Sequence, residues 1–161
     1  MPTDAADFAE ALIAMAAGTA AQQGVLNIDA MHGFDPGALR LAIESGTQQR
    51  YENYLSQKIW SPLNAAPAWI ELPAKGATTP ADCCLHARMI DWMRVASLLV
   101  GDGHFEGRQV LPAGWVQRMA RPLSLDAVRG FGLQLAPAHP PWSSPLPLRS
   151  TPGLASRHRR P

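Results

Sequence analysis

Two histidine–aspartate pairs are candidates for acid–base chemistry in this sequence. His86 and Asp91 fall in the most regular amphipathic segment, but a spacing of five residues keeps them off a shared helix face. His32 and Asp35 flank a loop that contains glycine and proline, and no nucleophile is positioned beside them. We therefore interpret His86 as a solvated surface histidine, and His32 with Asp35 as polar loop residues.

Aromatic and basic residues supply two further candidate sites. Trp60, Trp69, Trp92 and Trp115 could line an aromatic substrate cleft, but three of them fall within or beside amphipathic segments, which favours core packing. The basic end Arg157–Arg160 could contact an acidic surface, although so short a run is typically just solvated.

The two cysteines are neighbours, Cys83 and Cys84. Adjacent thiols rarely form an unstrained disulfide, so the pair says little about the redox compartment. No further ligands stand nearby at metal-binding spacing, and Gly101–Gly103 is a turn signal, not a phosphate loop, because it closes a helix and does not follow a strand. We expect no metal and no cofactor.

The elements that would position these residues are mostly helical, because apolar residues recur near a period of 3.6. In the first half of the chain, the pattern predicts a helix at Asp4–Ala17 capped by Thr3 or Asp4, mostly loop over Gly18–Gly33, and a helix at Leu39–Glu44 closed by Ser45 and Gly46. A helix from Tyr51 that Pro62 stops should follow, and then a connector at Ala65–Thr79 with an extended piece at Ala68–Leu72. The last predicted elements are helices at Leu85–Val100 and Gly114–Met119 and a strand at Phe131–Leu135.

The helix predicted at Leu85–Val100 has the clearest pattern. Its apolar stripe is predicted to consist of Leu85, Met89, Trp92, Met93, Ala96, Leu99 and Val100. The polar face opposite this stripe would carry Arg88, Asp91 and Arg94, and a tight turn through Asp102 and Gly103 should follow.

Charge and hydropathy exclude several classes of function. The 161 residues carry a formal net charge of +1, with Lys and Arg scattered until the C-terminus, so we expect no nucleic-acid partner. The longest apolar runs, Ala11–Ala17 and Ala96–Val100, are too short for a membrane span. No signal peptide is visible, and neither the compartment nor the oligomeric state follows from the sequence.

Two blocks of the sequence, Glu44–Leu63 and Cys83–Val116, carry a family resemblance. Together they resemble the middle of serine hydrolases of the β-lactamase and penicillin-binding-protein superfamily, in particular esterases and aminohexanoate-oligomer hydrolases related to class C β-lactamases. The segment Arg129–Leu135 resembles the strand that follows in that family. The resemblance implies part of an α+β fold, here mostly its helical lobe with one or two strands. It also implies a parent activity in which an acyl-serine forms from a small ester or amide substrate.

The catalytic elements that this family requires are not in the sequence. No serine or threonine is followed three residues later by lysine, and Ser56 and Lys58 lie on different faces of a helix. Tyr51 and Asn53 form a literal Tyr-x-Asn, but within a helix where the family has no catalytic group, so we interpret Tyr51 as a packing aromatic. Lys-Thr-Gly is absent too. We therefore predict no catalytic, cofactor-binding or metal-binding residue in this chain.

Three segments follow from this comparison. We expect an N-terminal helix and loop over residues 1–34, a partial β-lactamase-related domain over 35–135, and a disordered Pro/Arg-rich tail over 136–161. A match that starts late and ends in such a tail is what a truncated or frameshifted gene would leave, whereas an intact reading frame through residue 161 would count against that origin. The alternative interpretation is a non-catalytic interaction module, a pseudoenzyme that docks through exposed apolar helix faces.

Overall fold

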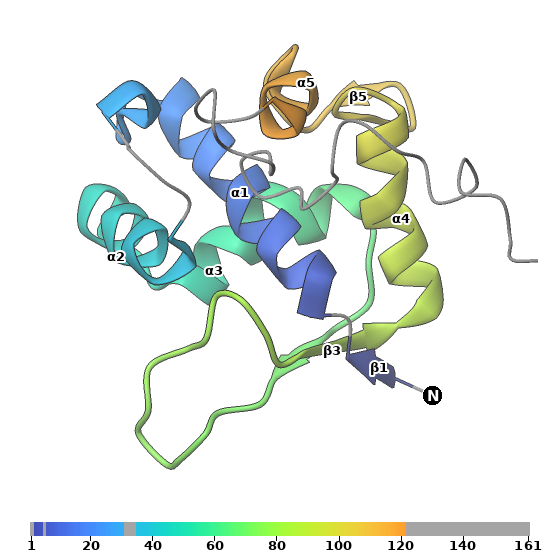
Figure 1. Ribbon diagram of the computed structural model, residues 1–161. Coiled ribbons are helices and arrows are strands. Elements are labelled where there is room, and N and C mark those ends of the chain that lie inside the picture. The colour runs from blue at the N-terminus through green and yellow to red at the C-terminus, as the bar shows by residue number, and fades with distance from the viewer. Residues whose placement is uncertain (1, 5, 31–34, 122–161) are drawn as a thin grey trace, which may run out of the picture.

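The computed structural model describes residues 2–4, 6–30 and 35–121 (Figure 1). The predicted strand at Phe131–Leu135, the predicted tail and His32 lie outside the described residues. The division into three segments therefore stays a prediction. Within the described residues, none of the helices has both the length and the apolar content that a membrane span needs.

Helix α1 (Ala6–Gln22) runs through the centre of the fold (Figure 1). Helices α2 (Pro36–Thr47) and α3 (Tyr51–Leu55) lie against one side of it, and α4 (Met89–Val100) lies across from them. Residues Ala11–Ala17 of α1 are almost fully buried on every side, not along one stripe, as expected of a helix that is apolar all round. The prediction that this helix ends near Ala17 is wrong, because α1 continues through Gly18 for another turn. The short 3-10 helix η1 (Ile28–Ala30) interrupts the predicted loop that follows.

Helix α2 (Pro36–Thr47) confirms the predicted second helix and is longer than expected at both ends. Asp35 caps it by accepting a hydrogen bond from the backbone N–H of Ala38 at 3.1 Å, and Pro36 occupies the first turn, where no amide donor is needed. Ser45 and Gly46 lie inside the helix, which ends at Gln48 in the left-handed conformation.

The helix predicted from Tyr51 is confirmed as three successive pieces. They are α3 (Tyr51–Leu55), a π-helical turn η2 (Ser56–Trp60) and a 3-10 turn η3 (Ser61–Leu63) that contains Pro62. Asn64 then leaves the helix with a φ of 51°. The wider turn η2 packs against α1, and its residues Ile59 and Trp60 are buried.

A small antiparallel sheet is formed by β1 (Pro2–Asp4), β2 (Trp69–Ile70) and β3 (Leu85–Arg88), in the order β1-β3-β2. Thr3 pairs with Ala87 and Trp69 pairs with His86. The extended piece predicted around Trp69 is confirmed. The N-terminal residues through Asp4 form a strand, so the predicted start of the first helix is two residues early.

The single helix predicted at Leu85–Val100 is two elements, the strand β3 and the helix α4 (Met89–Val100). The buried side of α4 holds Asp91, Trp92, Val95 and Leu98. The predicted apolar stripe is therefore wrong for much of its length, since Met89, Met93 and Val100 are exposed. The hairpin β4 (His104–Phe105) and β5 (Arg108–Gln109) follows, then α5 (Trp115–Ala120), as the turn and helix predictions expect.

Cys83 and Cys84 form a disulfide directly before β3. Adjacent cysteines rarely pair, so the bond differs from the sequence expectation. The backbone around the bond is held by a hydrogen bond from the N–H of Glu71 to the carbonyl of Cys84 at 2.8 Å, which continues the pairing between β2 and β3. Cys84 has a φ of 69°, in the left-handed region that few residues other than glycine adopt.

Candidate functional site

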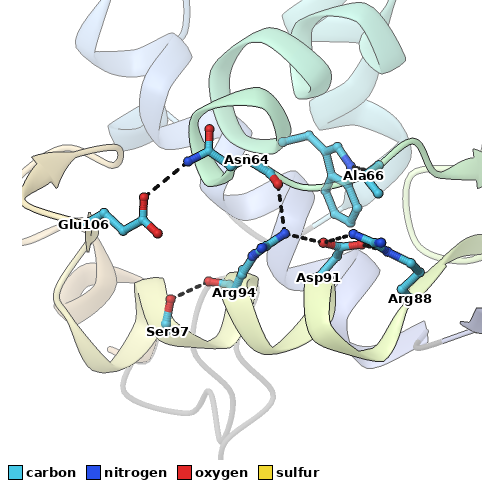
Figure 2. A network of polar contacts seen from close by, with 8 residues as sticks. Asn64, Ala66, Arg88, Asp91, Arg94, Ser97 and Glu106 are labelled. Carbon is cyan, nitrogen blue, oxygen red and sulfur yellow. Dashed lines mark hydrogen bonds and ion pairs between the residues drawn. The ribbon is translucent and has the colours of Figure 1, made fainter.

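The polar cluster at the start of α4 is centred on Asp91, whose side chain is only 1% exposed (Figure 2). Arg88 donates to Asp91 from Nε at 2.8 Å and from Nη2 at 3.2 Å. Arg94 donates from Nη1 at 2.7 Å, and the backbone N–H of Ala66 donates to the same carboxylate. The bonds from Arg88 are the main cause that holds the pKa of Asp91 below its ordinary value, against a desolvation that acts to raise it.

The same cluster joins three segments of the chain. Arg94 also donates to the carbonyl of Asn64 at 2.8 Å, and the Asn64 amide donates to Glu106 at 3.2 Å. Figure 2 shows this line of contacts running from the turn after η3 to α4 and to the β4–β5 hairpin. Every oxygen of the buried carboxylate is thus committed to holding segments together. We conclude that Asp91 is a structural anchor, because no acceptor capacity is left facing a cleft.

His86 and Asp91 have separate partners in the structure, as their spacing of five residues predicts, and His32 lies outside the described residues. His86 lies in β3, where its ring stacks on Trp69 at 5.5 Å between centroids and its Nε2 lies 3.4 Å from Glu71 Oε2. Asp91 is bound by arginines instead. Asp35 is a helix cap, which is a structural role.

The literal Tyr-x-Asn motif is not assembled as a site. The Tyr51 side chain is 2% exposed and its burial raises the pKa of the phenol far above the ordinary value, whereas Asn53 is exposed. The backbone N–H of Tyr51 donates to Glu44 Oε1 at 3.0 Å. The structure therefore agrees with a packing role for Tyr51.

The serine and lysine of η2 are also separate. Lys58 places its ammonium group over the Tyr54 ring, 5.9 Å from the centroid, while Ser56 is exposed. Among the described residues no histidine or lysine bonds to the Ser56 hydroxyl.

Three of the four candidate tryptophans pack in the core, as expected. Trp60, Trp92 and Trp115 are each less than 10% exposed, and Trp60 meets Trp92 edge to face at 5.9 Å. Trp115 donates from Nε1 to the carbonyl of Ala14 at 3.0 Å. Trp69 is half-exposed on the sheet edge.

A cavity of about 570 Å³ lies beside α3 and η2. Its apolar lining includes Leu55, Trp60, Ile70, Leu72 and Leu85, and its polar lining includes Arg50, Glu52, Ser56, Ser61 and Thr79. A second cavity of about 480 Å³ shares Arg50 and Thr79 with the first and is lined otherwise by α2 and the loop at 76–78. Sequence reasoning missed this pair of cavities, because Thr79 reaches Glu52 only through the tertiary fold.

No cluster of three or more histidine, cysteine, aspartate or glutamate side chains suited to a metal ion occurs in the ranges that the structure describes. The two cavities offer apolar surface, the ion pair of Arg50 with Glu52, and hydroxyl groups.

Comparison with solved structures places this arrangement in a known fold. A candidate β-lactamase from Bacteroides dorei superposes with a TM-score of 0.51 over 58% of this chain, at 16% identity. The fold is that of a β-lactamase-type protein. A penicillin-binding-protein homologue from Pyrococcus abyssi, described as octameric, gives a TM-score of 0.42 over 58% of this chain, also at 16% identity.

This chain spans 34% of the length of the first of these structures and 27% of the second. No family model and no curated protein matches its sequence. The expectation of a mostly helical part of an α+β fold is confirmed. The finer assignment to class C relatives or esterases is not reached by a likeness of this kind, which identifies the fold alone.

Proposed function

We propose that this chain is part of a β-lactamase-type serine hydrolase and that these 161 residues do not carry out acyl transfer. The observation that supports a hydrolase scaffold is the superposition on the candidate β-lactamase. In such enzymes a serine attacks an ester or amide carbonyl, and a nearby base takes the proton from its hydroxyl. The described residues would then form structural support and one wall of a substrate cleft.

The absence of a paired nucleophile in the sequence supports the second half of the proposal. Lys58 and Lys75 are the two lysines of the chain, and neither follows a serine or threonine by three residues. The buried hydroxyl of Thr19 donates to the carbonyl of Ala16 at 2.8 Å and lies 3.0 Å from the Tyr54 hydroxyl. The Thr19 hydroxyl is enclosed in the core, where no substrate can reach it.

A covalent probe tests this proposal directly. The folded chain is treated with a fluorophosphonate or a chromogenic cephalosporin, and its intact mass is then measured. We expect no adduct, because no serine hydroxyl among the described residues is hydrogen-bonded to a basic side chain that could activate it. An active serine β-lactamase treated in parallel confirms that the reagent is competent. A stoichiometric adduct on the chain would contradict the proposal, and peptide mapping would identify the serine.

A second candidate function, the non-catalytic interaction module, is favoured by the exposed face of α4. Met89, Ile90, Met93 and Val100 are between 54% and 90% exposed on this one helix. Large apolar side chains gathered on a surface are typical of sites that bind another protein.

Thermal unfolding separates the module from a fragment that needs the rest of its domain. For an evolved module we expect one cooperative transition from a monomer or a defined oligomer, with the same midpoint by circular dichroism and by calorimetry. Broad, probe-dependent melting with aggregation is the result expected of an incomplete domain, and it would rule out the module. Size-exclusion chromatography with light scattering before heating establishes the starting state.

A further inference from the structure

Arg50 lines both cavities, and its guanidinium group is held through one atom, Nε. Its Nε lies 2.5 Å from Glu52 Oε1, and Glu52 Oε2 accepts a hydrogen bond from the Thr79 hydroxyl at 3.1 Å. Both carboxylate oxygens of Glu52 are thus engaged. The side chain of Arg50 is nevertheless 68% exposed, and its Nη1 and Nη2 atoms have no ion-pair or hydrogen-bond partner among the described residues.

A guanidinium group fixed through Nε presents its two terminal nitrogens as a fork. This fork matches the spacing of the two oxygens of a carboxylate, so the pair forms two parallel charge-assisted hydrogen bonds. Lysine could not offer this geometry, because its ammonium group is a point charge. Arg50 lines both cavities, so an anionic group bound to it would sit where the two meet.

The larger cavity supplies the complementary apolar space. Leu55, Trp60 and Leu85 are each less than 10% exposed and form its floor, with the half-exposed Leu72 at its rim. The indole N–H of Trp60 is already bonded to the carbonyl of Ala66 at 2.7 Å, so its contribution to the cavity is apolar surface. The volume of about 570 Å³ falls within the range of small-molecule sites.

The larger cavity and Arg50 together form a groove. We propose that this groove binds a small organic carboxylate with an unbranched or ring-shaped apolar body. The body occupies the cavity floored by Leu55 and Trp60, and the carboxylate forms a bidentate pair with Arg50. Glu52 and Thr79 position Arg50 and do not contact the ligand. The binding needs no nucleophile, so it stands whether or not the chain belongs to an acyl-transfer enzyme.

The test titrates the full chain with octanoate and, separately, with the uncharged octanamide of the same length. Calorimetry measures the dissociation constants, and amide shifts in two-dimensional NMR locate the site. We expect saturable octanoate binding that shifts amides lining the groove, and about tenfold weaker binding of octanamide, as expected from loss of a bidentate charged pair.

Three variants make the test specific. Arg50→Gln should weaken octanoate about tenfold and leave octanamide unchanged, because only the charged fork is lost. Leu72→Asp, at an exposed rim position, should weaken both ligands. Arg121→Gln removes an exposed arginine outside both cavities and should alter neither.

Each contrary result overturns the inference. Failure of the folded chain to bind octanoate saturably would exclude the site. Equal affinity for octanoate and octanamide, or equal losses in Arg50→Gln and Arg121→Gln, would exclude recognition of the carboxylate by Arg50.

Discussion

Replacing Asp91 by asparagine lowers the free energy of unfolding by about 3 kcal/mol, because it removes the charge that two arginines and a backbone amide share. The side chain is buried, so water cannot replace these contacts. Urea unfolding at neutral pH measures the loss. The matched control is Asp29→Asn, which removes a carboxylate that is 81% exposed and paired with Arg118. A surface pair of that kind contributes less than about 1 kcal/mol.

The loss of unfolding free energy caused by Asp91→Asn depends on pH. The pKa of Asp91 in the folded protein lies below the unfolded value of about 3.9, so its stabilising contribution is fully present above that value. The contribution is lost as the pH falls through the lower folded pKa. The difference in free energy of unfolding between the parent chain and Asp91→Asn should therefore become smaller below about pH 4. A difference that stays constant from neutral to strongly acidic pH would contradict the role assigned to the ionised carboxylate.

Gly18→Ala is expected to destabilise the chain by about 2 kcal/mol, although alanine is the better helix former by about 1 kcal/mol. A methyl group at position 18 would overlap the indole ring of Trp115, which packs directly on the α1 backbone. The Trp115 ring is fixed by its bond to the carbonyl of Ala14, so it cannot move away without breaking that bond. Thermal unfolding of the purified variants measures the effect.

A double-mutant cycle separates this overlap from other effects of the substitution. In a Trp115→Phe background the smaller ring leaves space, and the cost of Gly18→Ala should shrink. Gly37→Ala in the first turn of α2 serves as the control, since its added methyl would meet nothing nearer than Asp35 Oδ1 at 3.3 Å. Stabilisation by Gly18→Ala would show that α5 does not lie against α1 as described.

The comparison of sequence with structure is instructive at α4. Apolar periodicity predicted a helix there and was correct from Met89 onward, but it placed Met89, Met93 and Val100 in the core and Asp91 on the surface. The rule that acids lie outside fails for Asp91, because Arg88 and Arg94 accompany it and neutralise it. A single sequence cannot distinguish an arginine that faces water from one that pairs with a buried acid.

The other differences have equally local causes. Gly18 is the first residue of the predicted loop, whereas in the structure it lies within α1 and permits the close approach of Trp115 from a distant helix. The family resemblance predicted the fold class, and the predicted helices at Leu39–Glu44 and from Tyr51 correspond to α2 and α3. The groove beside Arg50 was not predictable, because its walls come from segments that are joined only after folding.

The contact between Trp115 and Ala14 spans 101 residues of sequence, and this has a consequence during protein synthesis. A ribosome adds about 5–20 residues per second, so the α5-facing side of α1 waits about 5–20 seconds for its partner to be made. Throughout that interval one side of the most apolar helix of the fold is uncovered on the nascent chain. We therefore expect slower translation or fewer available chaperones to lower the yield of folded chain.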